Sequence, residues 1–338
     1  MKGLALPFVF AALLAVAALI GIPSYPLHIM IVILIWAFTY TGWSLMGRFG
    51  LVSLGHGAFM GVGAYATALL WNYAGMTPWL GIPIALALAA LLAVVVGYPC
   101  FKFRITGHYF ALVTLALTEV VRQTVIATRD HTGGSLGFTP TPKGNDDTPG
   151  YIALQFDEKE TWFLIAVLVW LVGLLIWRAV DRSMVRNALD AISEDEDSAA
   201  AAGINVTWEK LKITVLSAIM TAFGGCMYVQ YQMFVSPDTV SGIGISLQIV
   251  FAVVAGGVFT KFGPTFGAII TLLLAEMLRI YIGTDAVGLD NAIYGVALVL
   301  FIVFLPKGIL GSIEDAVGRQ IGKVERSRAA AGSGARGA

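Results

Sequence analysis

Charged residues are scarce in this sequence. Lys, Arg, Asp and Glu together make up 12% of its 338 residues, whereas hydrophobic residues make up 58%. A soluble domain carries about 25% charged residues, and a water-soluble chain this apolar would expose large hydrophobic patches. The composition therefore excludes an ordinary soluble domain and indicates a protein that lies in the lipid bilayer. The formal net charge is zero, so total charge gives no reason to expect nucleic acid as a partner.

Cysteine and recognisable catalytic groupings are also scarce. The two cysteines, Cys100 and Cys226, lie in or beside separate apolar runs, which argues against a disulfide framework or a metal site. The sequence lacks the phosphate-binding motif G-x-x-x-x-G-K-[ST] of nucleotide hydrolases and any nucleophile–base or metal-ligand grouping. We therefore expect no catalytic residues, no metal and no cofactor bound by this chain, and a membrane enzyme is the least favoured alternative.

Long apolar runs, by contrast, are abundant. A membrane-spanning helix needs about 20 mainly apolar residues, and ten segments qualify, of which the third, eighth and tenth are short. They are Leu4–Ile22, Leu27–Met46, Ala58–Trp71, Trp79–Pro99, His108–Thr128, Thr161–Arg178, Leu211–Phe234, Leu247–Phe259, Phe262–Ile282 and Ala292–Leu305. The first is interpreted as a retained helix, because no small-x-small cleavage site follows its long apolar run. We predict an all-α, polytopic transmembrane bundle of about ten helices.

The positions of the basic residues predict the orientation of this bundle. With the N-terminus in the cytoplasm, 16 of the 21 Lys and Arg residues fall on the cytoplasmic side, as the positive-inside rule requires. Both termini are then cytoplasmic. Residues 1–310 form the membrane domain, with a long cytoplasmic loop at 179–210 and an external loop at 129–160. Residues 311–338 form a cytoplasmic tail whose end we expect to be disordered.

The cytoplasmic loop contains signals for one short helix. Ser193 and Glu196 fit the S-x-x-E capping box, the alanines from 199 to 202 have the highest helix propensity, and Gly203 stands where a helix end favours a left-handed residue. The sequence predicts a helix at about Glu194–Ala202. Such a helix is compatible with a solvated connector and with an element that docks into a groove of another protein.

Glycines cluster at the start of the third apolar run. Gly57 and Gly61 form a small-xxx-small pair typical of close helix packing. They also permit a broken or re-entrant helix, which a membrane tolerates only where protein or a water-filled cavity covers the backbone. No second His, Cys or carboxylate lies at ligand spacing from His56, so we interpret His56 as a hydrogen-bonded interior residue.

Two charges, Glu119 and Arg122, lie within the fifth apolar run. Residues three apart share one helix face, and charges within a span usually face the bundle interior because exposing them to lipid is costly. An internal ion pair that fixes the rotation of the helix and a polar element beside a transport path are both compatible with this spacing.

These segments together resemble the permease subunits of branched-chain amino-acid importers. The coupling loop of that family resembles residues 191–207 of this chain. This segment reads A-I-S-E-D-E, continues with the alanine run and ends in G-I-N-V-T. S-L-G-H-G-A-F at 53–59 resembles a family signature, as does the run from Tyr109 to Arg122 with its Y-F-A, T-L and E-x-x-R elements. Asp197, Ser198, Ala200 and His108 depart from the family pattern. The matches run from about Phe49 to Gly308.

The resemblance implies a multi-pass subunit of an ATP-driven (ABC) importer in a bacterial-type inner membrane. It implies a second, related permease subunit, two ATP-binding subunits that hold ATP and Mg, and an external solute-binding protein. The residues that it assigns to ATPase coupling are Ser193, Glu194, Glu196, Ala199, Ala200, Gly203, Ile204 and Asn205. Those that it assigns to the translocation path or its gating are Ser53, Gly55, His56, Gly57, Thr114, Glu119 and Arg122.

Two alternatives to branched-chain amino-acid import stay open. Relatives with this signature carry urea, short amides or other small polar solutes, and selectivity resides largely in the binding protein. An ion-coupled secondary transporter would also account for Gly-interrupted spans and an intramembrane charge pair. It leaves the capped cytoplasmic helix unexplained, and the sequence shows no convincing inverted repeat.

Overall fold

The computed structural model describes residues 22–141 and 149–282, together with positions 293, 295, 296, 300 and 308. This part of the chain is helical, and its only β-type pairing is an isolated bridge between Phe138 and Val235. The long helices are α2 (Ser24–Gly47), α3 (His56–Ala74), α4 (Pro78–Lys102), α5 (Gly107–Ala127), α8 (Lys159–Asp181), α11 (Val206–Gln232), α13 (Ile243–Gly256) and α14 (Gly263–Ile282). The short elements are α6 (Arg129–Thr132), η1 (Gly134–Leu136), α7 (Gly150–Ala153), α9 (Met184–Glu194), α10 (Glu196–Ala201) and α12 (Pro237–Val240).

Seven helical stretches are long and apolar enough to cross a membrane. They are α2, α4, α5, α8, α11, the α12–α13 stretch Pro237–Gly256, and Gly263–Tyr281 of α14. The predicted third span is also a helix, α3, although it is less apolar than these. The predicted first and tenth spans lie outside the described residues except for a few positions. The all-helical, multi-pass architecture is thus confirmed, whereas the count of about ten and the side of the termini stay predictions.

The predicted eighth span, Leu247–Phe259, was placed too far along the chain. The helix α13 begins at Ile243 and ends at Gly256. Its flanking residues Gly242 and Gly257 have φ angles of +91° and +119°, a region that glycine adopts without steric cost and that cannot continue a right-handed helix. The two glycines therefore fix both ends of α13, and apolar composition alone gave no sign of them.

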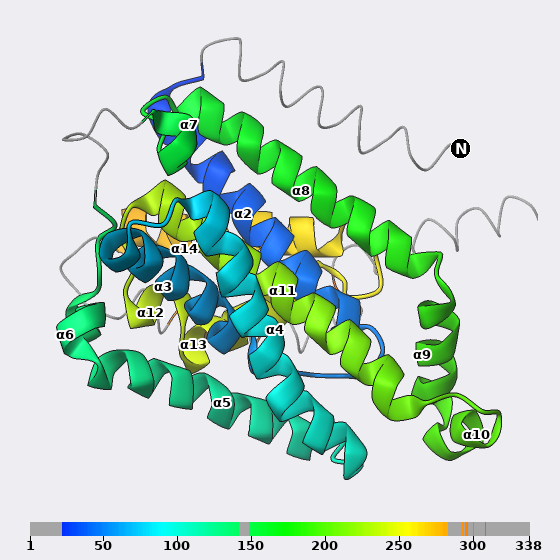
Figure 1. The fold of residues 1–338 in the computed structure, drawn as a ribbon. Helices are drawn as coiled ribbons and strands as arrows, with labels where there is room; N and C mark the ends of the chain where they lie inside the picture. The colour runs from blue at the N-terminus through cyan, green and yellow to red at the C-terminus, as the bar shows by residue number, and fades with distance from the viewer. Residues whose placement is uncertain are drawn as a thin grey trace, which may run out of the picture.

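Helices α2, α3 and α11 form the centre of the bundle (Figure 1), with α11 packed against α2, α3 and α4. Glycines allow this close packing. A Cβ at Gly63 of α3 would collide with the backbone of Ala222 in α11, and a Cβ at Gly225 of α11 would collide with the backbone of Met60 in α3. Small residues that let two backbones approach are the usual means of helix association in lipid. Helices α8 and α14 also pack against α2.

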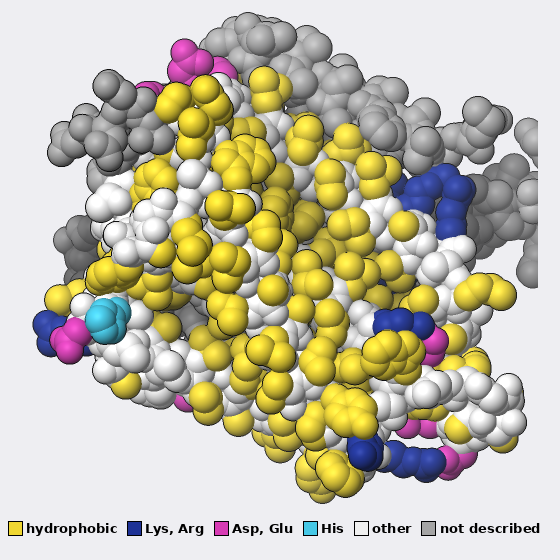
Figure 2. Space-filling view, viewed as in Figure 1, with side chains coloured by type: hydrophobic (Ala, Val, Ile, Leu, Met, Phe, Trp, Pro, Cys, Tyr) yellow, Lys and Arg dark blue, Asp and Glu magenta, His cyan; other side chains and the backbone are white. Residues whose placement is uncertain are grey.

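The outer helices present apolar side chains to their surroundings. The exposed apolar residues of α4 include Leu80, Ile84, Leu88, Leu91 and Val95, and those of α5 include Leu112 and Val120. In the space-filling view, hydrophobic side chains cover the middle of the visible face, and most of the charged groups gather at its two ends (Figure 2). This is the pattern expected of a bundle whose flank contacts lipid or another membrane subunit.

The two ends of the bundle are distinguished by their loops. At one end, here called the α10 end, Arg48 after α2 pairs with Asp181 of α8 (3.2 Å), and Arg104 after α4 pairs with Asp197 of α10 (2.8 Å). At the opposite end, here called the α6 end, Trp79 of α4 donates to the Tyr151 carbonyl (2.8 Å) and Lys159 donates to Ser24 (2.7 Å). Helices α2, α4 and α8 therefore run in one direction, from the α6 end to the α10 end.

Candidate functional site

The loop at 179–210 lies at the α10 end and folds into two helices, α9 and α10, where one was predicted. The predicted capping box at Ser193 is wrong. Ser193 lies in the last turn of α9, and its hydroxyl donates to the Asp190 carbonyl at 2.7 Å, the local bond that Ser forms inside helices. The N-cap of α10 is Asp195, whose carboxylate accepts from the Ser198 amide at 2.8 Å. This bond lowers the pKa of the Asp195 carboxyl below its ordinary value.

The end of α10 matches the expectation for Gly203. Its φ angle is +90°, its amide donates to the Ala200 carbonyl (3.0 Å), and the Ile204 amide donates to the Ala199 carbonyl (3.1 Å). These two bonds form a Schellman motif, which satisfies the last carbonyls of a helix. Ala199 is buried and Ile204 packs on the core, so the apolar side of this short helix is fixed to the bundle.

The loop is also tied to α4 and α11. Lys210, which is buried near the start of α11, pairs with Glu196 of α10, and Asn205 caps α11 by accepting from the Trp208 amide at 3.1 Å. A hollow of about 250 Å³ lies between the end of α4 and residues 204–207. Glu194, Ala200 and Gly203 remain exposed. The predicted coupling residues thus divide into an anchored set, Glu196, Ala199 and Ile204, and an exposed set that a partner could reach, which comprises Ser193, Glu194, Ala200, Gly203 and Asn205.

The segment before α3 enters the bundle without helical structure. Residues 51–55 carry no helix, and their backbone is satisfied by side chains of two helices. Trp43 of α2 donates to the Ser53 carbonyl (2.8 Å), the Leu54 amide donates to Thr114 of α5 (3.0 Å), and Thr118 of α5 donates to the Leu54 carbonyl (2.9 Å). Irregular backbone among membrane helices is tolerated only when it is satisfied in this way. The re-entrant interpretation of the glycine cluster fits this arrangement.

His56 begins α3 in the interior of the bundle and is fully buried. Its Nε2 lies 2.7 Å from Ser217 Oγ of α11, and that hydroxyl lies 2.7 Å from the Gly42 carbonyl of α2. The expectation of a hydrogen-bonded interior histidine is confirmed. Ser53, Gly55, Gly57 and Thr114 lie around it and are buried as well. These five predicted path residues therefore form packing contacts in this structure and border no cavity that is described.

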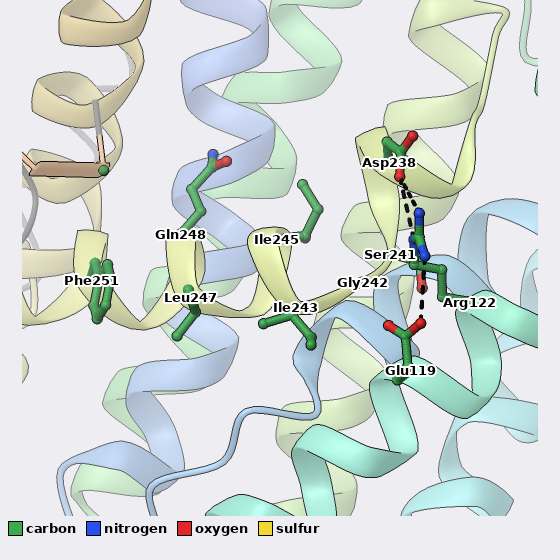
Figure 3. A pocket seen from close by; sticks show the side chains of 12 residues that line it. Glu119, Arg122, Asp238, Ser241, Gly242, Ile243, Ile245, Leu247, Gln248 and Phe251 are labelled. Carbon is green, nitrogen blue, oxygen red and sulfur yellow. Dashed lines mark hydrogen bonds and ion pairs between the residues drawn. The ribbon is translucent and has the colours of Figure 1, made fainter. Parts of the chain in front are cut away.

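Glu119 and Arg122 lie elsewhere, on the wall of the largest described cavity, of about 600 Å³ (Figure 3). The predicted ion pair is present, with Arg122 Nη1 3.4 Å from Glu119 Oε1. A closer partner is Asp238 of α12, whose Oδ1 lies 3.0 Å from Arg122 Nη2. The guanidinium thus joins α5 to α12 at the start of α13. A Cβ at Gly242 would lie 2.9 Å from Arg122 Cδ, so the glycine makes room for this arginine.

Sequence reasoning found only Glu119 and Arg122 of this cavity and missed its other lining residues, among them Asp238 and Ser241. Both line it, and both belong to the short segment between α11 and α13. The S-P-D sequence at 236–238 and Ser241-Gly242 predict a turn. No sequence pattern predicts that this turn lies beside Arg122 of α5, which is 116 residues earlier in the chain than Asp238. Across the described ranges, no group of three His, Cys, Asp or Glu residues could hold a metal ion.

The comparisons with known proteins match most of the chain. Residues 25–305 match the family described as "Branched-chain amino acid transport system / permease component". No solved structure matches the chain with significance. The family match thus extends from the second residue of α2 beyond α14 and includes the non-helical residues 51–55, the cavity and the α9–α10 loop.

Curated relatives transport several kinds of solute. The high-affinity branched-chain amino acid transport system permease protein LivM of Escherichia coli is 29% identical over 284 residues, which are 79% of this chain and 65% of LivM. The match therefore spans less than two thirds of the length of that relative. The L-arabinose permease protein AraH of Escherichia coli is 27% identical over 55% of this chain and 52% of AraH. The nucleoside permease protein NupC of Lactococcus lactis is 23% identical over 70% of this chain and 75% of NupC.

Proposed function

This chain belongs to the family of branched-chain amino-acid transport permease components, and we propose that it is one of two membrane subunits of an ATP-driven importer for branched-chain amino acids. The second subunit is a related permease. Two ATPase subunits bind ATP and Mg and dock at the α10 end, and an external solute-binding protein delivers substrate at the α6 end. The observation that supports this proposal best is the α9–α10 loop, a short helix fixed on one side and exposed on the other.

The charge distribution supports a cytoplasmic position for the α10 end. The described basic residues at or near this end are Arg48, Lys102, Arg104, Arg178, Arg182, Arg186, Lys210, Lys212 and Lys261. Those toward the α6 end are Arg122, Arg129, Lys159 and Arg279. Excess Lys and Arg in short loops marks the cytoplasmic side. The ATPases and the α9–α10 loop then lie on the same side of the membrane.

The contacts of α10 would allow it to transmit a movement of the ATPases to the membrane helices. Glu196 joins it to α11 through Lys210, and Asp197 reaches Arg104 after α4. Movement of α10 by an ATPase would therefore act directly on α11, one of the central helices, and on the end of α4. Nucleotide-driven closure of the ATPases would shift the equilibrium between two arrangements of the bundle, because the two arrangements hold the coupling loop differently. The exposed set of coupling residues would contact the ATPase.

A glycine substitution tests the coupling role. Gly203→Pro replaces a φ of +90° by one that proline fixes near −65°, which disrupts the end of α10. We expect ATP-dependent leucine uptake by proteoliposomes with the complete importer to fall about tenfold or more. The ATPases would lose their contact with α10, while the membrane helices stay assembled. Membrane insertion and the yield of the full-length chain report on assembly.

Gly75 provides the matched control. It also has a positive φ, of +60°, with open space around it, but it follows α3 at the α6 end. Gly75→Pro should leave the coupling of ATP hydrolysis to uptake intact. Normal uptake in Gly203→Pro, or equal losses in both variants, would contradict the coupling role. Uptake driven by an ion gradient without any ATPase would instead favour the secondary transporter.

A further inference from the structure

A second charged contact at the α10 end joins three helices. Asp181, the last residue of α8, accepts from Arg48 Nη1 at the end of α2 (3.2 Å) and from Arg186 Nη1 of α9 (2.7 Å). Both guanidinium groups bind the same carboxylate oxygen, Oδ1. The first helix of the α9–α10 loop is therefore linked to α2, a central helix of the bundle, through one side chain. This link is separate from the ion pairs that join α10 to α11 and α4.

Arg48 fixes the α2 side of this contact. Its side chain is 6% exposed, and its Cζ lies 4.7 Å from the ring centre of Phe49 and 4.5 Å from that of Trp177 in α8. Stacking between two rings leaves a guanidinium little freedom to move. Its Nε and Nη2 have no hydrogen-bond partner among the described residues, and its one ion pair in that part of the chain is with Asp181. A buried charge depends strongly on such a partner, so the Asp181 carboxylate is tied to α2.

Arg186 forms the opposite side of the contact and is more exposed, at 44%. It belongs to α9, which continues almost directly into α10 (Figure 1), and it also pairs with Asp190 one turn later (3.3 Å). Leu189 and Ile192 of α9 are buried, whereas Asn187 and Asp190 are exposed. The helix thus rests on the bundle with one side only. The contact has a fixed end on α2 and an end that would move with the coupling loop.

Stability alone gives a poor account of this arrangement. Well-packed apolar residues of the same volume often stabilise a protein as much as a buried ion pair does. Arg48 also keeps two nitrogen atoms unsatisfied, which costs free energy. Two guanidinium groups that share one oxygen affect each other's bond, because a shift of one changes the electrostatic field at the other. The strength of the contact between α2 and α8 therefore depends on the position of α9.

We propose that Asp181 is a positioning residue for energy coupling. Its carboxylate transmits a movement of α9 to α2, so that closure of the ATPases reaches the centre of the bundle by a second route. Arg48 anchors the carboxylate, and Arg186 delivers the movement. This inference rests on the proposed function and adds α2 and α8 to the helices on which the coupling loop acts.

Arg186→Gln tests this role with the least disturbance, because it leaves the buried pair of Arg48 and Asp181 in place. The measurement is the number of leucine molecules taken up per ATP hydrolysed by proteoliposomes with the complete importer. We expect this ratio to fall about fivefold while ATP hydrolysis stays within about twofold of wild type, as for the loss of a modest coupling free energy. A purely structural role would lower hydrolysis and uptake together, and the unchanged ratio would then overturn the proposal.

Two substitutions of Asp181 assign the effect to its carboxylate. Asp181→Asn should lower the ratio at least as much as Arg186→Gln, and the double variant should be no worse than Asp181→Asn alone, because Arg186 acts through this residue. Asp181→Asn lowers the yield of folded importer, since Arg48 loses its partner, but the ratio does not depend on that yield. Asp181→Glu keeps the charge and should recover about half of the wild-type ratio or more. Additive losses in the double variant, or no recovery in Asp181→Glu, would refute the assignment.

Lys212→Gln is the matched control. Lys212 lies at the same end, is similarly exposed and pairs with Glu209 of its own helix at 2.7 Å, so its ion pair joins no second helix to α11. Its ratio should equal that of wild type. A fall as large as that of Arg186→Gln would show that the loss of a positive charge at this end, and not the link to α2, is the cause.

The wild-type importer separates the two hypotheses. If it takes up leucine with ATP and Arg186→Gln keeps the wild-type ratio, the inference about Asp181 fails and the proposed function stands. If the complete wild-type importer shows no ATP-dependent leucine uptake, the proposed function fails and the inference fails with it.

Discussion

The hydrogen bonds of His56 determine which atom donates at each step of a short buried chain. Ser217 has one hydroxyl proton, and the Gly42 carbonyl, 2.7 Å away, can only accept it. Ser217 Oγ must therefore accept from His56 Nε2, which places a proton on Nε2. Its Nδ1 has no hydrogen-bond partner in the described residues. This chain of bonds joins α3, α11 and α2 at the point where α3 begins.

Ser217→Ala should destabilise the bundle by about 1–3 kcal/mol, because it leaves a buried donor on His56 without a partner. Thermal unfolding in detergent measures the change. Adding His56→Phe should recover part of the loss, since removing both polar partners is less costly than removing one. Additive losses in the double variant would show that the two side chains do not act as a pair.

A second prediction at this scale concerns the cap of α10. Asp195 accepts from the Ser198 amide, and this bond lowers the carboxyl pKa from its ordinary 3.8. A depressed folded-state pKa means that the stabilisation is fully present above the unfolded pKa and is lost as the pH falls through the folded value. Hydrogen exchange in residues 196–201, corrected for intrinsic rates, should therefore speed up when the pH is lowered below about 4.

Three variants isolate this effect. Asp195→Ala should exchange roughly fivefold faster at neutral pH, because the cap is lost. Asp195→Asn should keep most of the protection and lose its dependence on pH, because an amide caps but does not titrate. Ser193→Ala should behave as wild type, since its hydroxyl bonds within α9. Fast exchange in Ser193→Ala would revive the rejected capping box.

At the scale of helices, the crossing of α3 and α11 depends on the absence of side chains at two positions. A Cβ at Gly63 would meet the Ala222 backbone of α11 at less than van der Waals distance, and backbone cannot move aside as a flexible side chain can. Gly63→Ala should therefore destabilise the bundle by about 1–3 kcal/mol. A fall in melting temperature in detergent would report this.

Gly81 of α4 is the matched control for that substitution. A Cβ there would have its nearest neighbours at 3.8 Å or more, which is ordinary contact. Gly81→Ala should thus be neutral or stabilising by up to about 1 kcal/mol through its higher helix propensity. If both substitutions lowered the melting temperature equally, steric exclusion at the α3–α11 crossing would not be the cause.

The helices also show which structural features can be predicted from the sequence and which cannot. Apolar length found the long helices, because a bilayer imposes the same requirement on every span. Gly203 was correctly placed at a helix end, since a left-handed residue there has a local sequence signal. The start of α10 was misjudged because Ser193 and Asp195 both stand at capping distance from a following polar residue, and only the preceding helix α9 decides between them.

The candidate site was partly predictable, because some of its residues have a local sequence signal and others do not. Glu119 and Arg122 are unusual within an apolar run, and their pairing follows from helix geometry alone. Asp238 and Ser241 lie in a polar turn, where such residues are ordinary, and their place beside Arg122 is set by tertiary packing. The buried role of Ser53, Gly55 and Gly57 likewise depends on α5 and α13, whose side chains contact this segment.

At the scale of the whole molecule, the proposal requires the α10 end to face the cytoplasm. Two exposed positions at opposite ends, Asp197 at 80% side-chain exposure and Leu136 at 72%, allow a direct test. The native thiols Cys100 and Cys226 are buried, so a single introduced cysteine should be the main target of a membrane-impermeant maleimide. Neither position lines the cavity beside Arg122.

Leu136→Cys should be labelled in intact cells or right-side-out vesicles, and Asp197→Cys only in inverted vesicles or after the membrane is opened. The difference should exceed about tenfold, because an impermeant reagent cannot cross the apolar core of the bilayer. The unsubstituted chain, treated in the same way, gives the background from the buried thiols. Labelling of Asp197→Cys from outside would place the α9–α10 loop beyond the reach of cytoplasmic ATPases. The importer proposal would then fail even though the fold and the family membership stand.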